Sequence, residues 1–351
     1  MRIVVTGATG NVGTSVVEAL AADPRVEQII GLARRRPRLE RPRTTWVQAD
    51  IASAPLAPLF AGADAVIHLA WLIQPSRDEQ TTHAANVAGS RRVFEAAAEA
   101  GVRVLVHASS IGVYSPGPKD SAVDESWPTD GTPSSFYSRH KAAAERALDE
   151  VEAAHPGLRV VRLRPALIFK REAASGIRRL FAGPLLPSVL IRPSLLPLLP
   201  LPAGLRIQAV HTADVAEAYR LAVTEESARG AYNVCAEPVL DAGTLGRALG
   251  ARVVELPVRR VRAAADLAWR LRLQPSEPGW LDMGMAVPIM DSGRIRRELG
   301  WSPARTADAA LLELLDGIRT SAGAATPPLD PRTGGPLRLR ELLTGVGATS
   351  R

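Results

Sequence analysis

Residues 1–13 read MRIVVTGATGNVG, and this stretch decides the fold. Arg2–Thr6 is a short apolar run typical of a buried strand, and the pattern that follows the glycines is that of a helix with one apolar face. Gly7, Gly10 and Gly13 stand between the two, with the spacing G-x-x-G-x-x-G. Glycines at such a turn let the backbone approach a pyrophosphate, and the helix N-terminus offers N–H donors and a positive potential. The stretch therefore predicts a dinucleotide-binding loop.

The same alternation of strand and helix continues to about residue 165. An Ala-rich helix is expected over Ala84–Ala100. Further apolar strands are expected at Glu27–Ala33, Thr44–Ala49, Asp64–Leu69, Gly101–Ala108 and Leu158–Arg164. Near-continuous apolar strands separated by helices indicate a parallel sheet that is covered on both faces. The predicted fold class is therefore α/β, a doubly wound Rossmann sheet, with a ligand crevice beyond the carboxyl ends of its strands.

The pattern after residue 165 predicts a second, smaller unit. We expect a Rossmann domain over residues 1–165, to which residues 206–235 return. A substrate domain or lid is expected over residues 166–205 and 236–320. Residues 321–351 carry many prolines and glycines and are predicted to be a loose tail.

One segment of the predicted substrate domain has an unusual composition. Gly183–Gly204 holds six prolines among leucines, which forbid a continuous helix. Long irregular segments often act as lids, so this segment is either an apolar lid over the crevice or a packed loop. Binding to a membrane surface or to another protein through it is a third alternative.

The composition excludes several classes of protein. The chain has 351 residues, of which 46% are hydrophobic, and this fraction is typical of a globular core rather than of a disordered chain. A single cysteine, Cys235, excludes a disulfide scaffold and favours a reducing compartment, so we expect a cytoplasmic protein. The sequence has no run of eighteen apolar residues and no signal-peptide pattern, so no membrane span is expected.

The net charge of +7 rests almost entirely on arginine, since only three lysines occur. An aromatic content of 4% offers few platforms for stacking bases, so nucleic acid is not an expected partner. The expected partner is a small-molecule substrate, and a homodimer is the expected form of any self-association.

The end of the second predicted strand indicates which dinucleotide is bound. A carboxylate there would hold the adenosine ribose of NAD, but the residues are Ala33, Arg34, Arg35 and Arg36. A guanidinium matches the 2′-phosphate of NADP, so NADP is favoured and NAD is the alternative. The alternative for the arginines is a solvated basic face. Asp50, after the third strand, is either a hydrogen-bond acceptor for adenine or a turn cap.

Tyr137 and Lys141 carry the second chemical signal. They lie four residues apart and share one face of a predicted helix. A nearby ammonium favours the phenolate, so Lys141 is expected to lower the pKa of Tyr137 and make it an acid or base near neutral pH. Ser109 and Ser110 close the fifth strand, where a hydroxyl can hydrogen-bond a carbonyl or alcohol.

With these motifs the chain resembles the extended short-chain dehydrogenases/reductases of the NAD(P)-dependent epimerase/dehydratase family, from Met1 to about Ile318. The matching segments are Thr6–Gly13, Asp50-Ile51, His68-Leu69-Ala70, Asn86, Ser109–Tyr114, Tyr137–Lys141, Arg164-Pro165, His211–Ala216 and Leu299–Pro303. The resemblance implies that Ser110, Tyr137 and Lys141 are catalytic. With Arg34, the implied cofactor-binding residues are Gly7, Thr9, Gly10, Asn11, Val12, Gly13, Asp50, Ile51, Leu69, Ala70, Asn86, Tyr137, Lys141, Pro165 and Ile168.

Departures from the family pattern bear on the substrate. Ala88 stands where many members carry a second Asn, Lys170 replaces a common Gly, and the Leu/Pro segment replaces a more polar loop. They favour a substrate less polar than a nucleotide sugar. Candidate substrate contacts are Trp71, Ser110 and His211, whereas Trp280 and the other tryptophans are expected to be packing residues.

The resemblance implies an NAD(P)-dependent oxidoreductase or epimerase that acts on an alcohol or carbonyl. Two alternatives remain: a nucleotide-sugar epimerase/dehydratase with tightly bound NAD, and a non-enzymatic redox-sensing regulator. The spacing of the six histidines matches no metal motif, so no metal site is expected.

Overall fold

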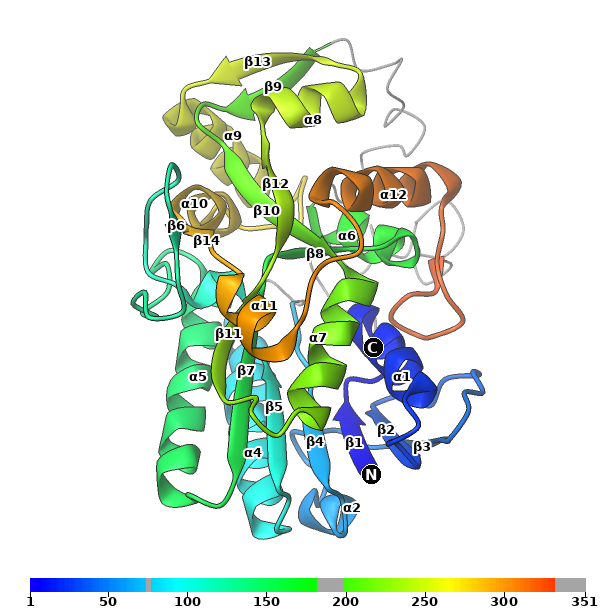
Figure 1. Cartoon of the computed structure of the whole chain (residues 1–351). Helices are drawn as coiled ribbons and strands as arrows, with labels where there is room; N and C mark the ends of the chain where they lie inside the picture. Colours follow the sequence, from blue (N-terminus) through cyan, green and yellow to red (C-terminus); the bar gives the residue numbers. More distant parts are fainter. Residues whose placement is uncertain (74–76, 182–197, 332–351) are drawn as a thin grey trace.

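A seven-stranded parallel sheet forms the centre of the computed structural model, which describes residues 1–73, 77–181 and 198–331 (Figure 1). From one edge to the other the sheet runs β11 (Gly230–Val234), β7 (Arg159–Pro165), β5 (Val104–Ala108), β4 (Ala65–His68), β1 (Arg2–Thr6), β2 (Gln28–Ala33) and β3 (Thr44–Gln48). Each neighbouring pair is parallel. The chain builds outward from β1 in both directions, so the order reverses between β1 and β4. The predicted doubly wound sheet is confirmed.

Helices cover both faces of this sheet because successive strand residues point to opposite sides. Ile3 and Val5 of β1 pack in one core with α1 (Asn11–Ala22) and α7 (Thr212–Thr224). Val4 packs in the other core. That second core includes α2 (Ala57–Phe60), α4 (Gly89–Glu99) and α5 (Phe136–Ala154).

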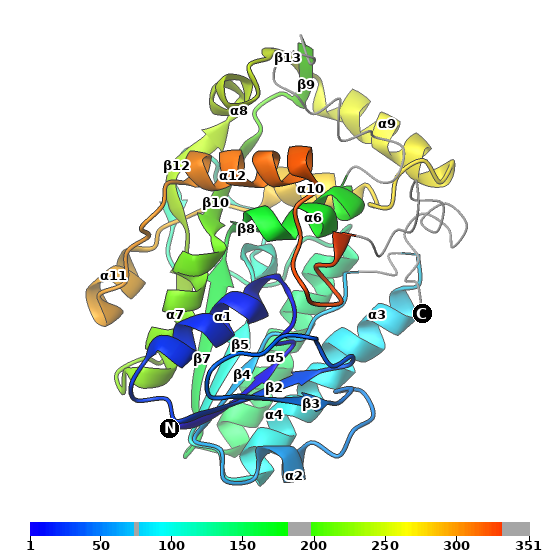
Figure 2. The same ribbon diagram turned by 90° about the vertical axis from the view of Figure 1, so that its right-hand side faces the viewer.

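A smaller lobe sits above the carboxyl ends of the strands (Figures 1 and 2). Its strands form a sheet of β12 (Ala236–Asp241), β10 (Arg206–His211) and β8 (Leu167–Phe169), a pair of β13 (Arg252–Leu256) and β9 (Leu198–Pro202), and a pair of β14 (Ile289–Met290) and β6 (Ala122–Val123). Its helices are α6 (Ala174–Phe181), α8 (Ala242–Leu249), α9 (Val258–Arg270), α10 (Gly279–Ala286) and α12 (Ala307–Thr320). The helix α11 (Gly293–Leu299) packs instead against β11, at the edge of the seven-stranded sheet (Figure 1).

Short helices complete the connections: α3 (Glu79–His83), the π-helical turn η1 (Ala84–Ala88), and the 3₁₀ turns η2 (Ile111–Val113) and η3 (Arg171–Ala173). The helix predicted over Ala84–Ala100 is thus a π-helical turn followed by α4. None of the helices in the described residues is long and apolar enough to cross a bilayer.

Two sequence-based expectations about boundaries need correction. Residues 206–211 are expected in the Rossmann domain, but they form β10, which pairs with β8 and β12 in the smaller lobe. The tail is expected to be loose from residue 321, but Thr326 and Leu329 are 1% and 3% exposed, and the Leu329 carbonyl accepts a hydrogen bond from the Ala324 amide. The burial of the apolar Leu329 side chain holds this segment on the protein, and a prediction from proline and glycine content alone does not include that contribution. Most of Gly183–Gly204 lies outside the described residues.

Candidate active site

The glycine loop is shaped by close backbone approach. Gly7 has a φ of +69°, and a Cβ added there would lie 2.7 Å from the Ala70 amide nitrogen. A Cβ on Gly13 would overlap the Gly7 carbonyl oxygen. Gly10 is the N-cap of α1, so no cap side chain takes up the first N–H groups of that helix. These uncapped donors can receive a phosphate, as the glycine spacing predicts.

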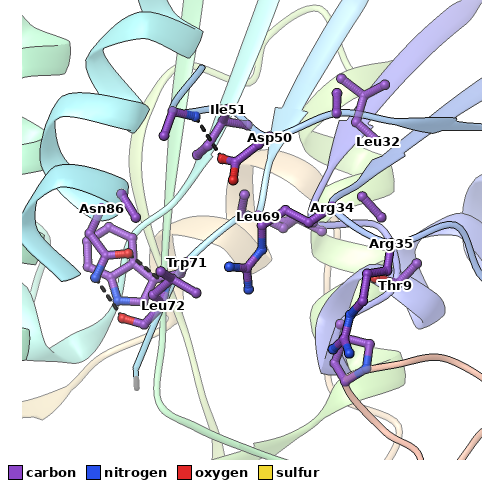
Figure 3. Close-up of a pocket in the computed structure, with 18 of the residues that line it drawn as sticks. Thr9, Leu32, Arg34, Arg35, Asp50, Ile51, Leu69, Trp71, Leu72 and Asn86 are labelled. Carbon is purple, nitrogen blue, oxygen red and sulfur yellow. Dashed lines mark hydrogen bonds between the residues drawn. The ribbon is translucent and has the colours of Figure 1, made fainter. Parts of the chain in front are cut away.

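A cavity of about 460 Å³ opens at this loop, along the carboxyl ends of β1, β2 and β4 (Figure 3). It is lined by Gly7, Thr9, Gly10, Leu32, Ala33, Arg34, Arg35, Ala49, Asp50, Ile51, Ala52, Leu69, Ala70, Trp71, Leu72, Thr81, Ala84, Ala85, Asn86, Pro327 and Pro328. The structure therefore brings together most of the residues expected to bind a cofactor, from the four loops that follow β1, β2, β3 and β4, and from η1. The volume is that of a small-molecule site.

Charged side chains stand at the β2 and β3 end of the cavity. Arg34 extends its guanidinium into the cavity, and Arg35 lies further along the rim, near Thr9 (Figure 3). Arg36 is exposed and does not line the cavity. Asp50 caps the turn after β3, since its Oδ1 accepts a hydrogen bond from the Ala52 amide at 2.9 Å. Asp50 also lines the cavity, and a hydrogen bond to adenine stays a prediction.

Asn86 fixes the wall opposite the arginines. Its Oδ1 accepts a hydrogen bond from the Leu72 amide, and its Nδ2 donates one to the Leu72 carbonyl, both at 2.7 Å. Asn86 is fully buried in η1, and π-helical turns are frequent at functional sites. Because the oxygen and the nitrogen of the Asn86 side chain both bond to the Leu72 backbone, they fix the chain after β4 beside the cavity.

Ser110, Tyr137 and Lys141 gather just beyond the cavity, at the end of β5 and the start of α5. Ser110 caps η2, where its Oγ accepts a hydrogen bond from the Gly112 amide at 3.0 Å. Burial raises the pKa of Tyr137 to about 12, and a hydrogen bond with Ser110 acts in the opposite direction. The two hydroxyls thus lie together, as the resemblance implies.

The electrostatics of this group differ from the sequence-based expectation. Lys141 is expected to lower the pKa of Tyr137, but burial raises it, and burial also lowers the pKa of Lys141 itself to about 7. The Lys141 Nζ donates to the Ala108 carbonyl at 2.6 Å and lies 5.8 Å from the Tyr137 ring centroid. An amine that is protonated in only about half of the molecules near pH 7, at this distance, cannot offset the free-energy cost of burying a charged phenolate.

Trp71 stands between the cavity and this group. It lines the cavity, and its ring centroid lies 3.5 Å from the Lys141 Nζ and 6.0 Å from the Tyr137 ring. Its indole Nε1 is buried without a hydrogen-bond partner among the described residues. Ser110, Tyr137 and Lys141 do not themselves line the cavity. Of the two alternatives for Trp71, pocket wall or packing residue, the geometry supports the wall.

Sequence reasoning missed two contributors to this end of the cleft. Trp280, expected to be a packing residue, lies with its ring 4.8 Å from that of Tyr137. Met283, one turn later on α10, packs in the same cluster as Tyr137. No local signal marks them, because α10 reaches Tyr137 only through the folding of the smaller lobe. Pro327 and Pro328, which line the cavity, were missed as well, because they reach it only when the segment after α12 folds back.

Several predicted site residues lie away from the cavity. His211 caps α7: its Nδ1 accepts from the Ala213 amide at 3.1 Å, and its Nε2 lies 3.2 Å from Glu313. Both ring nitrogens are therefore engaged, which removes the reason to expect a substrate contact. Asn11, Val12, Gly13, Pro165 and Ile168 do not line the cavity either.

Lys170 has a place of its own beside the glycine loop. Its Nζ donates to the Asn11 carbonyl at 2.8 Å and to Thr14 Oγ1 at 2.7 Å. Burial lowers the pKa of Lys170 to about 8. The residue that departs from the family pattern thus fastens the first turn of α1. Within the described part of the chain, no cluster of His, Cys, Asp and Glu could hold a metal ion.

Comparison with known proteins places this geometry in a family. An uncharacterized protein of Mycobacterium tuberculosis is 27% identical over 328 residues, which are 92% of this chain and 31% of that protein. The chain therefore spans about a third of the length of the first curated relatives that it matches. A 4-hydroxy-2-methyl-3-oxo-4-farnesyl-3,4-dihydroquinoline-1-oxide ketoreductase of Stigmatella aurantiaca is 31% identical over 173 residues, 48% of this chain and 51% of that protein.

Among solved structures, the UDP-glucose 4-epimerase of Thermus thermophilus in complex with NAD has the same fold. It superposes with a TM-score of 0.67 at 22% identity, over 91% of this chain and 99% of that one. The model of the NAD dependent epimerase/dehydratase family matches residues 3–235, from β1 through β11. The resemblance predicted from the motifs is confirmed at the level of the family: the chain belongs to the NAD dependent epimerase/dehydratase family.

Proposed function

We propose that the protein is an NADP-linked oxidoreductase that interconverts an alcohol and a carbonyl on a small apolar molecule. The observation that carries the proposal is the meeting of Ser110, Tyr137 and Lys141 directly beyond the cavity that the glycine loop borders. A hydroxyl pair beside a lysine, at the end of such a cleft, suits proton transfer to or from a substrate oxygen.

The protonation states favour the direction of reduction. With a pKa of about 12, Tyr137 keeps its proton at neutral pH and can donate it to a carbonyl oxygen that is becoming an alkoxide. Ser110 can donate a second hydrogen bond to the same oxygen and orient it. A nicotinamide dinucleotide, when bound, supplies the hydride. Lys141 is proposed to hold the dinucleotide near Tyr137, as the family resemblance implies.

The residues present fit a dinucleotide. Gly7 and Gly13 leave room that a Cβ would fill, and Gly10 leaves the first turn of α1 uncapped. Arg34 at the rim, without a carboxylate at the end of β2, supports a 2′-phosphate and hence NADP. Asn86 is proposed to act by holding the Leu72 backbone in place rather than through a direct cofactor contact.

The surroundings of Tyr137 support an apolar, ring-bearing substrate. Trp71 and Trp280 flank the Tyr137 ring, and Met283 lies in the same cluster. Aromatic side chains and a flexible thioether favour flat apolar groups over a hydrated sugar diphosphate. The relative named for a ketoreductase of a farnesyl quinoline oxide supports both the reaction and the substrate class.

A nucleotide-sugar epimerase or dehydratase with tightly bound NAD is the second candidate, because the solved neighbours with this fold include a UDP-glucose 4-epimerase in complex with NAD. An epimerase returns its hydride to the same molecule and therefore keeps its cofactor. The third candidate, a non-enzymatic sensor, would bind the dinucleotide without turnover. Retention of the Ser110, Tyr137 and Lys141 group weighs against it.

Two measurements on the purified protein separate these candidates. Denaturing mass spectrometry identifies any nucleotide that the protein retains, and NADPH absorbance follows turnover with cyclic ketones and with nucleotide sugars. The proposal expects no retained NAD, and NADPH consumption with cyclic ketones alone. Stoichiometric retained NAD with epimerisation of a nucleotide sugar would establish the second candidate. NADPH binding without any turnover would favour the sensor.

A further inference from the structure

Exposed apolar side chains concentrate at the outer end of the smaller lobe. Six large hydrophobic side chains are exposed among the described residues, and all but Leu312 belong to this end. The five are Leu198 on β9, Val254 on β13, Leu267 on α9, and Leu271 and Leu273 directly after α9. Figure 2 shows α9 and the β9–β13 pair at this end, away from the seven-stranded sheet. Such clustering on one part of a monomer marks an interaction surface.

The helix α9 is apolar on two sides. Val258, Val261 and Trp269 are half-buried and form its inner side. Leu267 and Leu271 lie four residues apart and are 58% and 60% exposed, so they form an outer apolar stripe. No residue of α9 is fully buried. The inner side of α9 is therefore partly covered by the protein, whereas the outer side has no packing partner among the described residues.

Arginines surround this outer stripe. α9 contains Arg259, Arg260, Arg262 and Arg270 against one acidic residue, and Arg272 follows it. Arg262 pairs with Asp282 and Arg270 with Asp266, each at 2.8 Å. Among the described residues, no carboxylate lies within ion-pair distance of Arg259, Arg260 or Arg272. We call Arg259, Arg260, Leu267, Leu271, Arg272 and Leu273 the α9 surface.

The charge of the α9 surface distinguishes between its conceivable occupants. A two-fold contact with a second copy of the chain would place these unpaired arginines against each other. An anionic bilayer offers both a matching charge for the guanidinium groups and an apolar layer for the leucines. A helix with a basic rim and exposed leucines is the form that lies in the headgroup region of a membrane.

The α9 surface is also connected to the aromatic end of the cleft. The Arg77 guanidinium lies 3.5 Å above the Trp269 ring and donates to the Trp269 carbonyl, which ties α9 to the segment that follows Trp71. After the C-terminal end of α9, the chain continues through residues 271–278 into α10, which carries Trp280. A surface that binds lipid here would be joined through α10 and Trp280 to the side chains around Tyr137.

We propose that the α9 surface docks on an anionic lipid bilayer as a peripheral contact. The leucines enter the headgroup region, and Arg259, Arg260 and Arg272 contact lipid phosphates. The contact requires neither cofactor nor turnover, so it stands or falls separately from the proposed reaction.

Vesicle co-sedimentation of the full-length protein tests this proposal. The probes are sucrose-loaded vesicles of phosphatidylcholine alone and of phosphatidylcholine mixed with phosphatidylglycerol, at low and high salt. Binding is expected only to the anionic vesicles and should weaken with salt. The paired change Leu267→Ser with Leu271→Ser should weaken it about tenfold or more. The paired change Arg259→Gln with Arg260→Gln should weaken it about thirtyfold.

Leu312→Ser is the matched control, because Leu312 is 48% exposed on α12 and lies outside the α9 surface. It should bind like the wild type, and all variants should unfold at the wild-type urea midpoint. Wild-type protein that stays in the supernatant with both kinds of vesicle would overturn the proposal. So would undiminished binding by the leucine pair. A wild-type dimer in light scattering that the leucine pair converts to monomer would assign the surface to a second copy instead.

Discussion

At the scale of single residues, Arg34 tests the choice of cofactor. It extends into the cavity where NAD-binding proteins of this type carry an acid. One charge-assisted contact contributes about 1.5–3 kcal/mol, which corresponds to about ten- to a hundredfold in the dissociation constant. Calorimetric titration should therefore show NADPH binding tighter than NADH by about that factor, and Arg34→Ala should remove most of the difference.

Arg36→Ala is the control for that titration, because Arg36 is an exposed neighbour that does not line the cavity. It should keep the preference for NADPH. Equal affinities of the wild type for the two cofactors would show that these arginines are a solvated face and that NAD is the working cofactor.

The three lysines of the chain give a prediction about pH. Burial lowers the pKa of Lys141 to about 7, and those of Lys119 and Lys170 to about 8, from 10.5. Between about pH 8 and 10 the unfolded chain binds a proton at each lysine that the folded chain does not bind. The free energy of unfolding should therefore rise with pH across this window. Above it, Tyr137 reverses the trend, because its raised pKa makes the folded chain retain a proton that the unfolded chain has lost.

Urea unfolding at a series of pH values measures this slope. Lys141→Met keeps a long apolar side chain and removes one titrating group, so its slope should be shallower than that of the wild type. A wild-type free energy of unfolding that falls between pH 8 and 10 would show that the lysines keep their ordinary pKa values in the folded protein.

At the scale of elements, the sequence predicted the parallel sheet and the glycine loop because their patterns are local. Arg2–Thr6 is a strand with the predicted bounds, and Gly7 needs its left-handed φ within the loop itself. The contacts that the smaller lobe makes around Tyr137 could not be predicted from local sequence patterns. Trp280 meets Tyr137 only because α10 packs against α5, and neither periodicity nor spacing encodes that contact.

The pKa of Tyr137 shows the same limit. Spacing placed Lys141 on the same helix face, but the sign of the pKa shift depends on burial by residues from elsewhere in the chain. The role of Asn86 was likewise visible as a motif position, while its pairing with the Leu72 backbone required the fold.

The η1 turn gives a prediction at this scale. Asn86→Ala removes two hydrogen bonds that hold Leu72, each worth about 0.5–1.5 kcal/mol, and leaves two partly buried backbone groups without these partners. The free energy of unfolding should fall by about 1–3 kcal/mol, and NADPH affinity should fall with it, because Leu72 lines the cavity. Urea unfolding and calorimetry measure the two effects.

Gln80→Ala is the comparison variant, since Gln80 is exposed on α3, close to η1 in the chain. It should match the wild type in both measurements. An Asn86→Ala protein with unchanged stability and unchanged NADPH affinity would contradict the role assigned to η1.

At the scale of the whole molecule, the two lobes meet at Tyr137. The Rossmann lobe supplies the glycine loop, Arg34 and α5, and the smaller lobe supplies α10 with Trp280. Segments far apart in the sequence border the cavity, since Pro327 and Pro328 line it together with the loop that begins at Gly7. The glycine loop and the Tyr137 and Lys141 pair lie within single segments of the Rossmann lobe, so the sequence could predict them. Trp280 comes from the other lobe, so the sequence could not predict its contact with Tyr137.

The most direct test of the account is the NADPH-dependent reduction of a cyclic apolar ketone by wild-type and Tyr137→Phe proteins. Tyr137→Phe removes the proton donor and keeps the ring that contacts Trp71 and Trp280. Turnover should fall by about a hundredfold or more, while the NADPH dissociation constant stays within about threefold. Tyr232→Phe, which loses a hydroxyl bonded to Glu298 at the β11 edge of the sheet, should turn over like the wild type. Near wild-type turnover by Tyr137→Phe would contradict the central claim that this hydroxyl delivers the proton.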